Sequence, residues 1–120
     1  MNKIAHRGNT KGRSNRENEP SRILEVAKEY FVELDVWYED NCFWLGHDKP
    51  EYKITLEFLK NDKFFCHAKN IHALHKMLEE GVHCFWHEND AITITSQGYV
   101  WKYPEVYLNG NLWGVCSDWL

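Results

Sequence analysis

The sequence contains no apolar run that approaches the length of a membrane-spanning helix, and its first residues lack the apolar core of a signal peptide. Closely spaced cysteines are lacking as well. The four cysteines are widely spaced and form no Cys-x-x-Cys pair, which argues against both a zinc ribbon and a disulfide framework. No internal repeat or low-complexity tract occurs. We therefore expect a cytoplasmic protein with free thiols, built as a single domain over residues 1–120.

Basic residues are too few to form a nucleic-acid-binding face. Fourteen Lys and Arg stand against 18 Asp and Glu, which gives a formal net charge of −4. The one basic cluster is Lys11, Arg13 and Arg16, which is either a local anion collar or a solvated loop. Because duplex-binding surfaces need a basic face, we expect no nucleic-acid partner. Aromatic residues are abundant, with six each of Trp, Tyr and Phe, and we expect them to fill the core and line any pocket.

The alternation of strand-like and helix-like segments predicts an α/β fold. We expect helices over 19–30, near 54–61 and over 71–81, and strands near 3–6, 31–36, 42–46, 63–67, 82–86, 92–95, 98–102 and 113–116. Eight strands that begin with βα alternation suit a TIM-type (β/α)8 barrel, which usually needs roughly 200 residues or more. The sequence thus predicts a compact or truncated barrel that has lost helices in its C-terminal half. An open version would find its missing wall in a partner, so a homodimer is one expected arrangement.

Two acidic residues stand out on the strand "FVELDVW" at 31–37. The strand period of two puts Glu33 and Asp35 on one face, with Val32, Leu34 and Val36 on the other. Burying two adjacent carboxylates is costly, and a bound cation removes that cost. Mg²⁺ or Ca²⁺, which prefer oxygen ligands, are the natural candidates. The alternative is an exposed edge strand with a solvated acidic face.

Histidines lie near the ends of several predicted strands. His6 ends the first strand and precedes Arg7, whereas His47 follows "CFWLG". Two histidines beside a dicarboxylate metal site are the parts needed for phosphodiester cleavage, one as proton acceptor and one as donor. In "FFCHAKN", His67 would bind metal or orient a ligand, and Lys69 would hold a phosphate oxygen. The alternative for a lone histidine on an apolar strand is a hydrogen-bonded core residue. Trp37, Trp86 and Trp101 would shape the pocket.

Four motifs follow one another in the first fifty residues: "IAHRG", "REN", "VELDVW" and "LGHD". In this order and at these separations they resemble the N-terminal signature of the glycerophosphodiester phosphodiesterase family, within the phosphatidylinositol-phospholipase-C-like barrels. The ending "GVCSDWL" is similar to the closing strand of that family.

The resemblance implies hydrolysis of a small phosphodiester of the glycerophosphodiester type, in lipid metabolism, with one divalent cation. It implies the following roles: His6 and His47 as the acid/base pair, Arg7 and Lys69 as phosphate contacts, Glu33 and Asp35 as metal ligands, and Glu17 as a supporting acid. His67 stands where the family has a third acidic ligand. The alternative is a module on the same barrel that has lost catalysis and binds a phosphate or a lipid head group.

Overall fold

The computed structural model describes residues 1–107 and 112–120, in which nine strands form one mixed sheet. The strands are β1 (Asn2–His6), β2 (Phe31–Glu39), β3 (Cys42–Leu45), β4 (Tyr52–Ile54), β5 (Phe64–Ala68), β6 (Cys84–Phe85), β7 (Ile92–Ile94), β8 (Val100–Lys102) and β9 (Gly114–Ser117). Three helices accompany them: α1 (Pro20–Val26), α2 (Leu56–Leu59) and α3 (Ile71–Glu79). No helix in the described ranges is long and apolar enough to cross a membrane.

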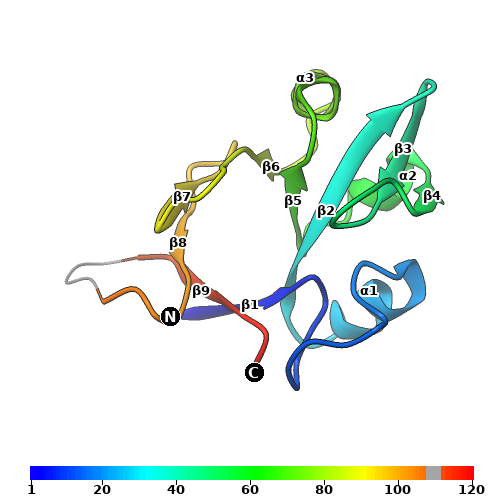
Figure 1. Ribbon diagram of the computed structural model, residues 1–120. Coiled ribbons are helices and arrows are strands. Elements are labelled where there is room, and N and C mark those ends of the chain that lie inside the picture. The colour runs from blue at the N-terminus through cyan, green and yellow to red at the C-terminus, as the bar shows by residue number, and fades with distance from the viewer. Residues whose placement is uncertain (108–111) are drawn as a thin grey trace.

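Six of the strands form a parallel series in the order β8–β9–β1–β2–β5–β6. β3 and β4 extend the sheet from the far end of β2 as antiparallel strands, and β7 pairs antiparallel with β8. The sheet curves strongly, so that β1, β2, β5, β6, β7, β8 and β9 lie around a ring in Figure 1. Beyond β7, the amide of Ser96 donates to the carbonyl oxygen of Cys84 at 2.8 Å, which ties the β7–β8 hairpin to β6.

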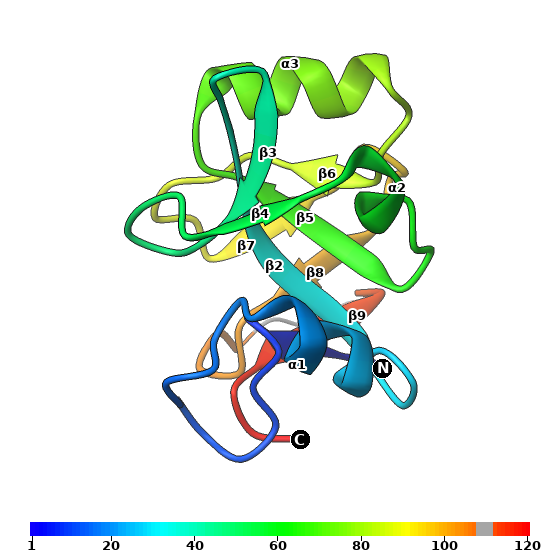
Figure 2. The same ribbon diagram turned by 90° about the vertical axis from the view of Figure 1, so that its right-hand side faces the viewer.

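The predicted (β/α)8 barrel is wrong. The helices have only seven, four and nine residues, all precede residue 80, and they lie on the side of β2 and β5 (Figures 1 and 2). The outer side of β7, β8 and β9 carries no helix in the described part of the chain. The physical reason is that the first two connections after β6 are short: residues 86–91 join it to β7 and residues 95–99 join β7 to β8, which leaves no room for a crossover helix.

The sheet is mixed because tight turns reverse the chain. Asp40 and Asn41 have φ of 53° and 59°, the left-handed pair that closes a two-residue hairpin between β2 and β3. The sequence predicted the strands on both sides of this turn, but it did not predict β4. Helix α1 is also shorter than expected, because it ends at Val26 and residues 27–30 form turns.

Two apolar clusters lie on opposite sides of the sheet. The larger one fills the space between the sheet and the helices, with Ile23, Leu34, Leu59 and Met77 fully or almost fully buried. The smaller one lies inside the curve and is largely aromatic: Ile4, Phe65, Phe85, Trp101 and Cys116, with Phe31, Tyr99, Tyr103 and Trp113 packed against it. The interior of the curved sheet is therefore filled by side chains and holds its strands rigidly.

Candidate active site

Ionisable side chains gather at the edge of the sheet where the parallel strands end. Along each strand the inner side changes from apolar to ionisable: Ile4 precedes His6, Phe31 precedes Glu33 and Asp35, Phe65 precedes His67, and Cys116 precedes Asp118. The register places His6 opposite Glu33 and Asp35 opposite His67. Because parallel strands end at the same edge, residues from distant parts of the sequence meet there.

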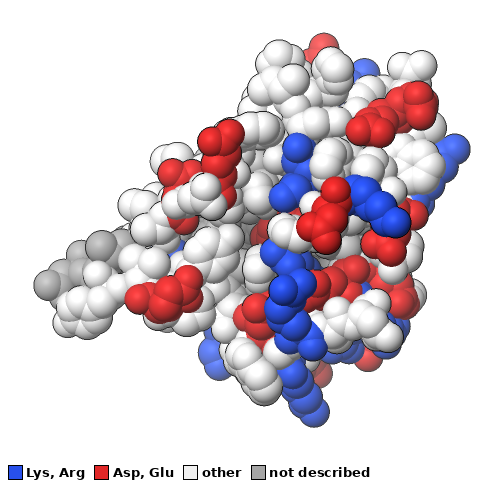
Figure 3. Space-filling model, viewed as in Figure 1, with Lys and Arg blue, Asp and Glu red and all other residues white. Residues whose placement is uncertain are grey.

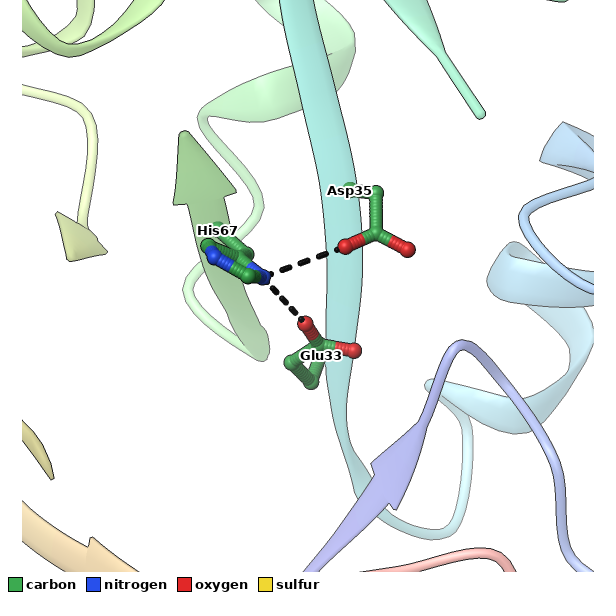
Figure 4. Close-up of side chains that lie close together, drawn as sticks. All are labelled: Glu33, Asp35 and His67. Carbon is green, nitrogen blue, oxygen red and sulfur yellow. Dashed lines mark ion pairs between the residues drawn. The ribbon is translucent and has the colours of Figure 1, made fainter. Parts of the chain in front are cut away.

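Glu33, Asp35 and His67 form the centre of this edge (Figure 4). The His67 Nδ1 atom lies 3.2 Å from Asp35 Oδ1 and 3.5 Å from Glu33 Oε2. Both carboxylates are 1% exposed, and the three ligand atoms lie within 4.8 Å of one another. The buried Glu33 Oε2 has no hydrogen-bond partner among the described residues. A bound cation would interact with the electron pairs of this buried oxygen, and these three residues could hold a metal ion.

The other nitrogen of His67 fixes which atom faces the carboxylates. Its Nε2 lies 3.2 Å from the carbonyl oxygen of His87, which can only accept, so Nε2 carries the hydrogen. The neutral ring then presents the electron pair of Nδ1 to Glu33 and Asp35. Metal-binding histidines are commonly oriented in this way, with the second ring nitrogen bound to a backbone carbonyl.

Charge within the cluster is reflected in two shifted pKa values. Burial raises the pKa of Asp35, but hydrogen bonds from His47, His67 and Asn18 outweigh it and hold the pKa of this carboxyl well below its usual range. Burial lowers the pKa of His67, but hydrogen bonds to Asp35 and Glu33 outweigh it and raise this pKa to about 9. In the absence of a metal ion, a proton on His67 Nδ1 therefore supplies the compensating positive charge.

The loop after β1 forms hydrogen bonds with the carboxylates of both Glu33 and Asp35. The side chain of Asn18 donates to Asp35 Oδ2 and accepts from the Asp35 amide, each at 2.9 Å. The amide of Arg7 donates to Glu33 Oε1 at 3.1 Å. Arg7 and Asn18 both have positive φ, 56° and 62°, a conformation that costs a non-glycine residue on the order of 1 kcal/mol. The strained backbone thus occurs at Arg7 and Asn18, the two residues whose hydrogen bonds orient the carboxylates.

His6 lies between two carboxylates. Its Nδ1 is 3.0 Å from Asp118 Oδ1, and its Nε2 is 3.9 Å from Glu33 Oε1. Asp118 is held in turn by the buried side chain of Asn9, which donates to it at 2.9 Å and to Glu17 at 2.6 Å. Because a carboxylate oxygen accepts, Nδ1 carries the hydrogen of the bond to Asp118, and Nε2 faces Glu33.

His47 has the opposite surroundings on the other side of the cluster. Its Nδ1 lies 3.3 Å from Asp35 Oδ2, and its Nε2 lies 3.2 Å from an Arg7 terminal nitrogen, which can only donate. The Nε2 atom therefore carries an electron pair, which accepts a hydrogen bond from Arg7 in this structure. Arg7 also pairs with Glu17 at 3.5 Å, while its buried Nε has no hydrogen-bond partner in the described ranges.

Two other predicted site residues form no hydrogen bond or ion pair with this group in the described part of the chain. Lys69 is half-buried beyond the end of β5, and its ammonium group forms no ion pair with the described part of the chain. Trp101 is fully buried and packs edge-on against Phe85, with ring centroids 5.3 Å apart. Trp101 thus supports the inner cluster and does not line a cavity. Trp86 is 41% exposed.

Sequence reasoning assigned no role to Asn9, Asn18 or Asp118, and the structure adds His87 to the surroundings of the site. The pKa of His87 is lowered to about 4, first by burial and then by the charge of His67, and its Nε2 shares a hydrogen bond of 3.2 Å with the Tyr103 hydroxyl. Asp118 was within reach of sequence analysis, because it belongs to the motif "GVCSD" at the chain end. Asn9 carried no comparable signal, since its role depends on two carboxylates from distant segments.

Open space lies on both sides of the cluster. A cavity of about 800 Å³ adjoins His6, lined among others by Tyr103, Glu105, Asp118 and Trp119. A smaller cavity of about 260 Å³ adjoins His47, with Arg13, Glu17 and Lys49 in its wall. Acidic and basic side chains are interspersed on the face shown in Figure 3, with no large area of one sign.

Comparison of the chain with models of known protein families found no match. Comparison with curated proteins and with solved structures found none either. Function therefore has to be inferred from the chemistry of the site itself.

Proposed function

We propose that this protein hydrolyses a small phosphodiester, of the glycerophosphodiester type, with the help of one divalent cation. The observation that carries the proposal is the placement of two carboxylate-bound histidines on either side of one metal-binding cluster. His6 adjoins Glu33 at 3.9 Å, and His47 adjoins Asp35 at 3.3 Å. An acid and a base on opposite sides of a cation are the arrangement that displacement at phosphorus requires.

Glu33, Asp35 and His67 would hold the cation, for which we propose Mg²⁺ or Ca²⁺. The unpaired Glu33 Oε2, the ionised Asp35 and the orientation of His67 Nδ1 support this assignment. When bound, such an ion neutralises charge that develops on the phosphate and makes a coordinated hydroxyl more acidic. Arg7, at the edge of the cluster, would bind a phosphate oxygen through its planar fork, with Lys69 as a second cation.

The two histidines would move protons in a two-step reaction. His47 Nε2 takes the proton of a substrate hydroxyl next to the phosphate, and that oxygen forms a bond to phosphorus. The bond from phosphorus to the leaving alcohol breaks, and His6 Nε2 gives its proton to the departing oxygen. Water then opens the cyclic phosphodiester with the roles reversed, so that both histidines return to their initial states.

Inactive binding of phosphate or a lipid head group is the second candidate. One observation favours it: Arg7 contacts the Nε2 of His47 at 3.2 Å, which occupies the atom that must accept the proton. The enzyme requires Arg7 to turn toward the substrate phosphate and release His47. A binding module has no such requirement.

Other expectations belong to the same proposal. Four free cysteines, three of them buried, support a cytoplasmic location. The interspersed surface charges in Figure 3 support a small-molecule substrate over a nucleic acid. The homodimer stays a prediction, which small-angle scattering of the purified protein would test.

The test is turnover of a panel of glycerophosphodiesters with Mg²⁺ or Ca²⁺ by the wild type, His6→Ala and His47→Ala. Each variant should lose about 10²–10⁴-fold in kcat with little change in substrate binding, because acid/base catalysis acts in the transition state. His75→Ala, an exposed histidine on α3, is the matched control and should keep full activity. Wild-type turnover no higher than that of the His6→Ala/His47→Ala double variant would reject the enzyme. Tight cation-dependent phosphate binding without turnover would support the binding module.

A further inference from the structure

Exposed apolar side chains concentrate between residues 71 and 94. Five of the nine large apolar side chains that are exposed in the described ranges lie there, on α3, after β6 and on β7: Ile71, Leu78, Trp86, Ile92 and Ile94. α3, β6 and β7 follow one another from the top to the left of Figure 1, and no described helix lies outside β7. Because soluble monomers rarely expose large contiguous apolar patches, this surface calls for a partner.

The strand β7 carries its two isoleucines on the outer side because its middle residue points inward. Thr93 is 5% exposed, and its hydroxyl binds Nδ1 of His87, whose ring packs edge-on against Trp101 inside the curve of the sheet. Alternation along the strand then puts Ile92 and Ile94 on the outer side, where they are 45% and 68% exposed.

Two contacts join β7 to β6 in a single antiparallel register. The residue numbers of the two contacting pairs have the same sum: Cys84 with Ser96, and His87 with Thr93. The same register places Trp86 beside Ile94 and Glu88 beside Ile92. Both Trp86 and Glu88 are exposed, and alternation puts them on the outer side, opposite to His87.

The strand β8 extends this outer surface on the other side of β7. The ladder pairs Ile94 with Val100 and Ile92 with Lys102. Trp101 lies between these two residues and is buried inside the curve, so Val100 and Lys102 lie on the outer side.

β7 therefore separates an acidic side from a basic side. Glu88 and Asp90 are exposed toward β6. Lys102 lies on β8, and Lys3 of β1 lies in the same row across Val115. None of these four charged groups forms an ion pair within the described part of the chain. The surface thus has an apolar centre with opposite charges on its two sides.

We propose that the outer face of β7 is a dimer interface, covered by a second copy of this chain. A twofold axis that runs along β7 brings the isoleucines of the two copies together and turns the acidic side of each copy onto the basic side of the other. Trp86 of one copy then faces Val100 of the other. Glu88 faces Lys102 in the same way. The surface is therefore complementary to itself in both its apolar and its charged groups.

The experiment is sedimentation equilibrium of the purified chain over a concentration series from micromolar to millimolar, which measures the Kd of the dimer. Ile94→Glu should raise this Kd by about 100-fold or more, because the axis brings the two new carboxylates together. Leu24→Glu, at an exposed apolar residue of α1, is the matched control and should stay within about 2-fold of the wild type. Circular dichroism checks that each variant is folded.

An exchange of charges tests which residues face each other. Glu88→Lys and Lys102→Glu should each raise the Kd about 10-fold, since each places like charges opposite one another at two symmetry-related positions. The double variant Glu88→Lys/Lys102→Glu has opposite charges again and should return to within about 3-fold of the wild type. Neither residue belongs to the proposed catalytic group, so this result does not depend on turnover.

Three outcomes would overturn the proposal. The first is a wild type that stays monomeric over the whole series, which would leave the outer face of β7 to a different protein. The second is a dimer whose Kd responds no more to Ile94→Glu than to Leu24→Glu. The third is a double charge variant that dimerises as weakly as the two single variants.

Discussion

Replacement of Asn18 should reveal how strongly the loop after β1 holds Asp35 in the cluster of Glu33, Asp35 and His67. The Asn18 side chain is 1% exposed and forms two hydrogen bonds of 2.9 Å with Asp35, one to its carboxylate and one from its amide. Its φ of 62° lies in the left-handed region. Glycine tolerates this conformation, whereas alanine does not. The pair Asn18→Gly and Asn18→Ala therefore separates the hydrogen bonds from the backbone conformation.

The magnitudes follow from these contacts. The bond to the ionised carboxylate contributes about 1.5–3 kcal/mol, and the bond from the Asp35 amide about 1 kcal/mol. Asn18→Gly should thus lower the free energy of unfolding by about 2–4 kcal/mol, with a small additional loss from the freedom of glycine in the unfolded chain. Asn18→Ala should cost about 1 kcal/mol more than Asn18→Gly, because its Cβ strains the left-handed conformation.

The assay is urea denaturation at pH 7 in chelator, read by tryptophan fluorescence. Asn15→Gly, an exposed asparagine in the same loop, is the control and should stay within about 0.5 kcal/mol of the wild type. The slope against urea should be unchanged, so that midpoints report stability. A loss below about 1 kcal/mol for Asn18→Gly, or an alanine variant as stable as the glycine variant, would refute the reasoning.

Three further predictions concern the same edge of the sheet. The pKa of His67 is near 6.5 when unfolded and about 9 when folded, so its stabilising effect is full below about pH 6.5 and is lost as pH rises through 9. In chelator the free energy of unfolding should fall by up to about 3 kcal/mol across this window, and it should fall less in His67→Gln. A free energy of unfolding that rises with pH would contradict the raised pKa of His67. Mg²⁺ or Ca²⁺ at one hundred times its Kd should stabilise the wild type by about 2.7 kcal/mol in calorimetry, and Glu33→Gln/Asp35→Asn should show no response. Asp118→Asn should lower kcat about 10²-fold or more with KM nearly unchanged, because the carboxylate that orients His6 is lost. A rise in KM with kcat unchanged would instead indicate that Asp118 contributes to substrate binding.

The strands were largely predictable because alternation in a strand is a local property. The alternation in "FVELDVW" predicts which residues share a face, and Glu33 and Asp35 do lie together on the inner side of β2. The alternation does not predict which strands are neighbours in the sheet. The antiparallel β3, β4 and β7 carry the same alternation as the parallel strands, and only the length of the connections decides between them.

The sequence predicted those site residues that lie at the ends of parallel strands. It did not predict those that depend on contacts between distant parts of the chain. His6, Glu33 and His67 meet because parallel strands end at one edge. The contact of His6 with Asp118 joins residues 112 positions apart, and neither residue indicates the other in the sequence. Asn18 was counted only as part of the motif "REN", because its double hydrogen bond requires the backbone of Asp35 to be in place.

The pairing of β1 with β9 has a consequence for synthesis in the cell. β1 leaves the ribosome early, but the strand beside it and the Asp118 carboxylate emerge 112 residues later, which at cellular rates of translation takes on the order of ten seconds. During that interval Glu33, Asp35 and His67 can already assemble, while one edge of β1 stays unpaired and His6 has no carboxylate on Nδ1. Under the proposed function, the residues that would hold the cation come together before His6 gains its carboxylate partner, and until then β1 keeps one edge open to pairing with another chain.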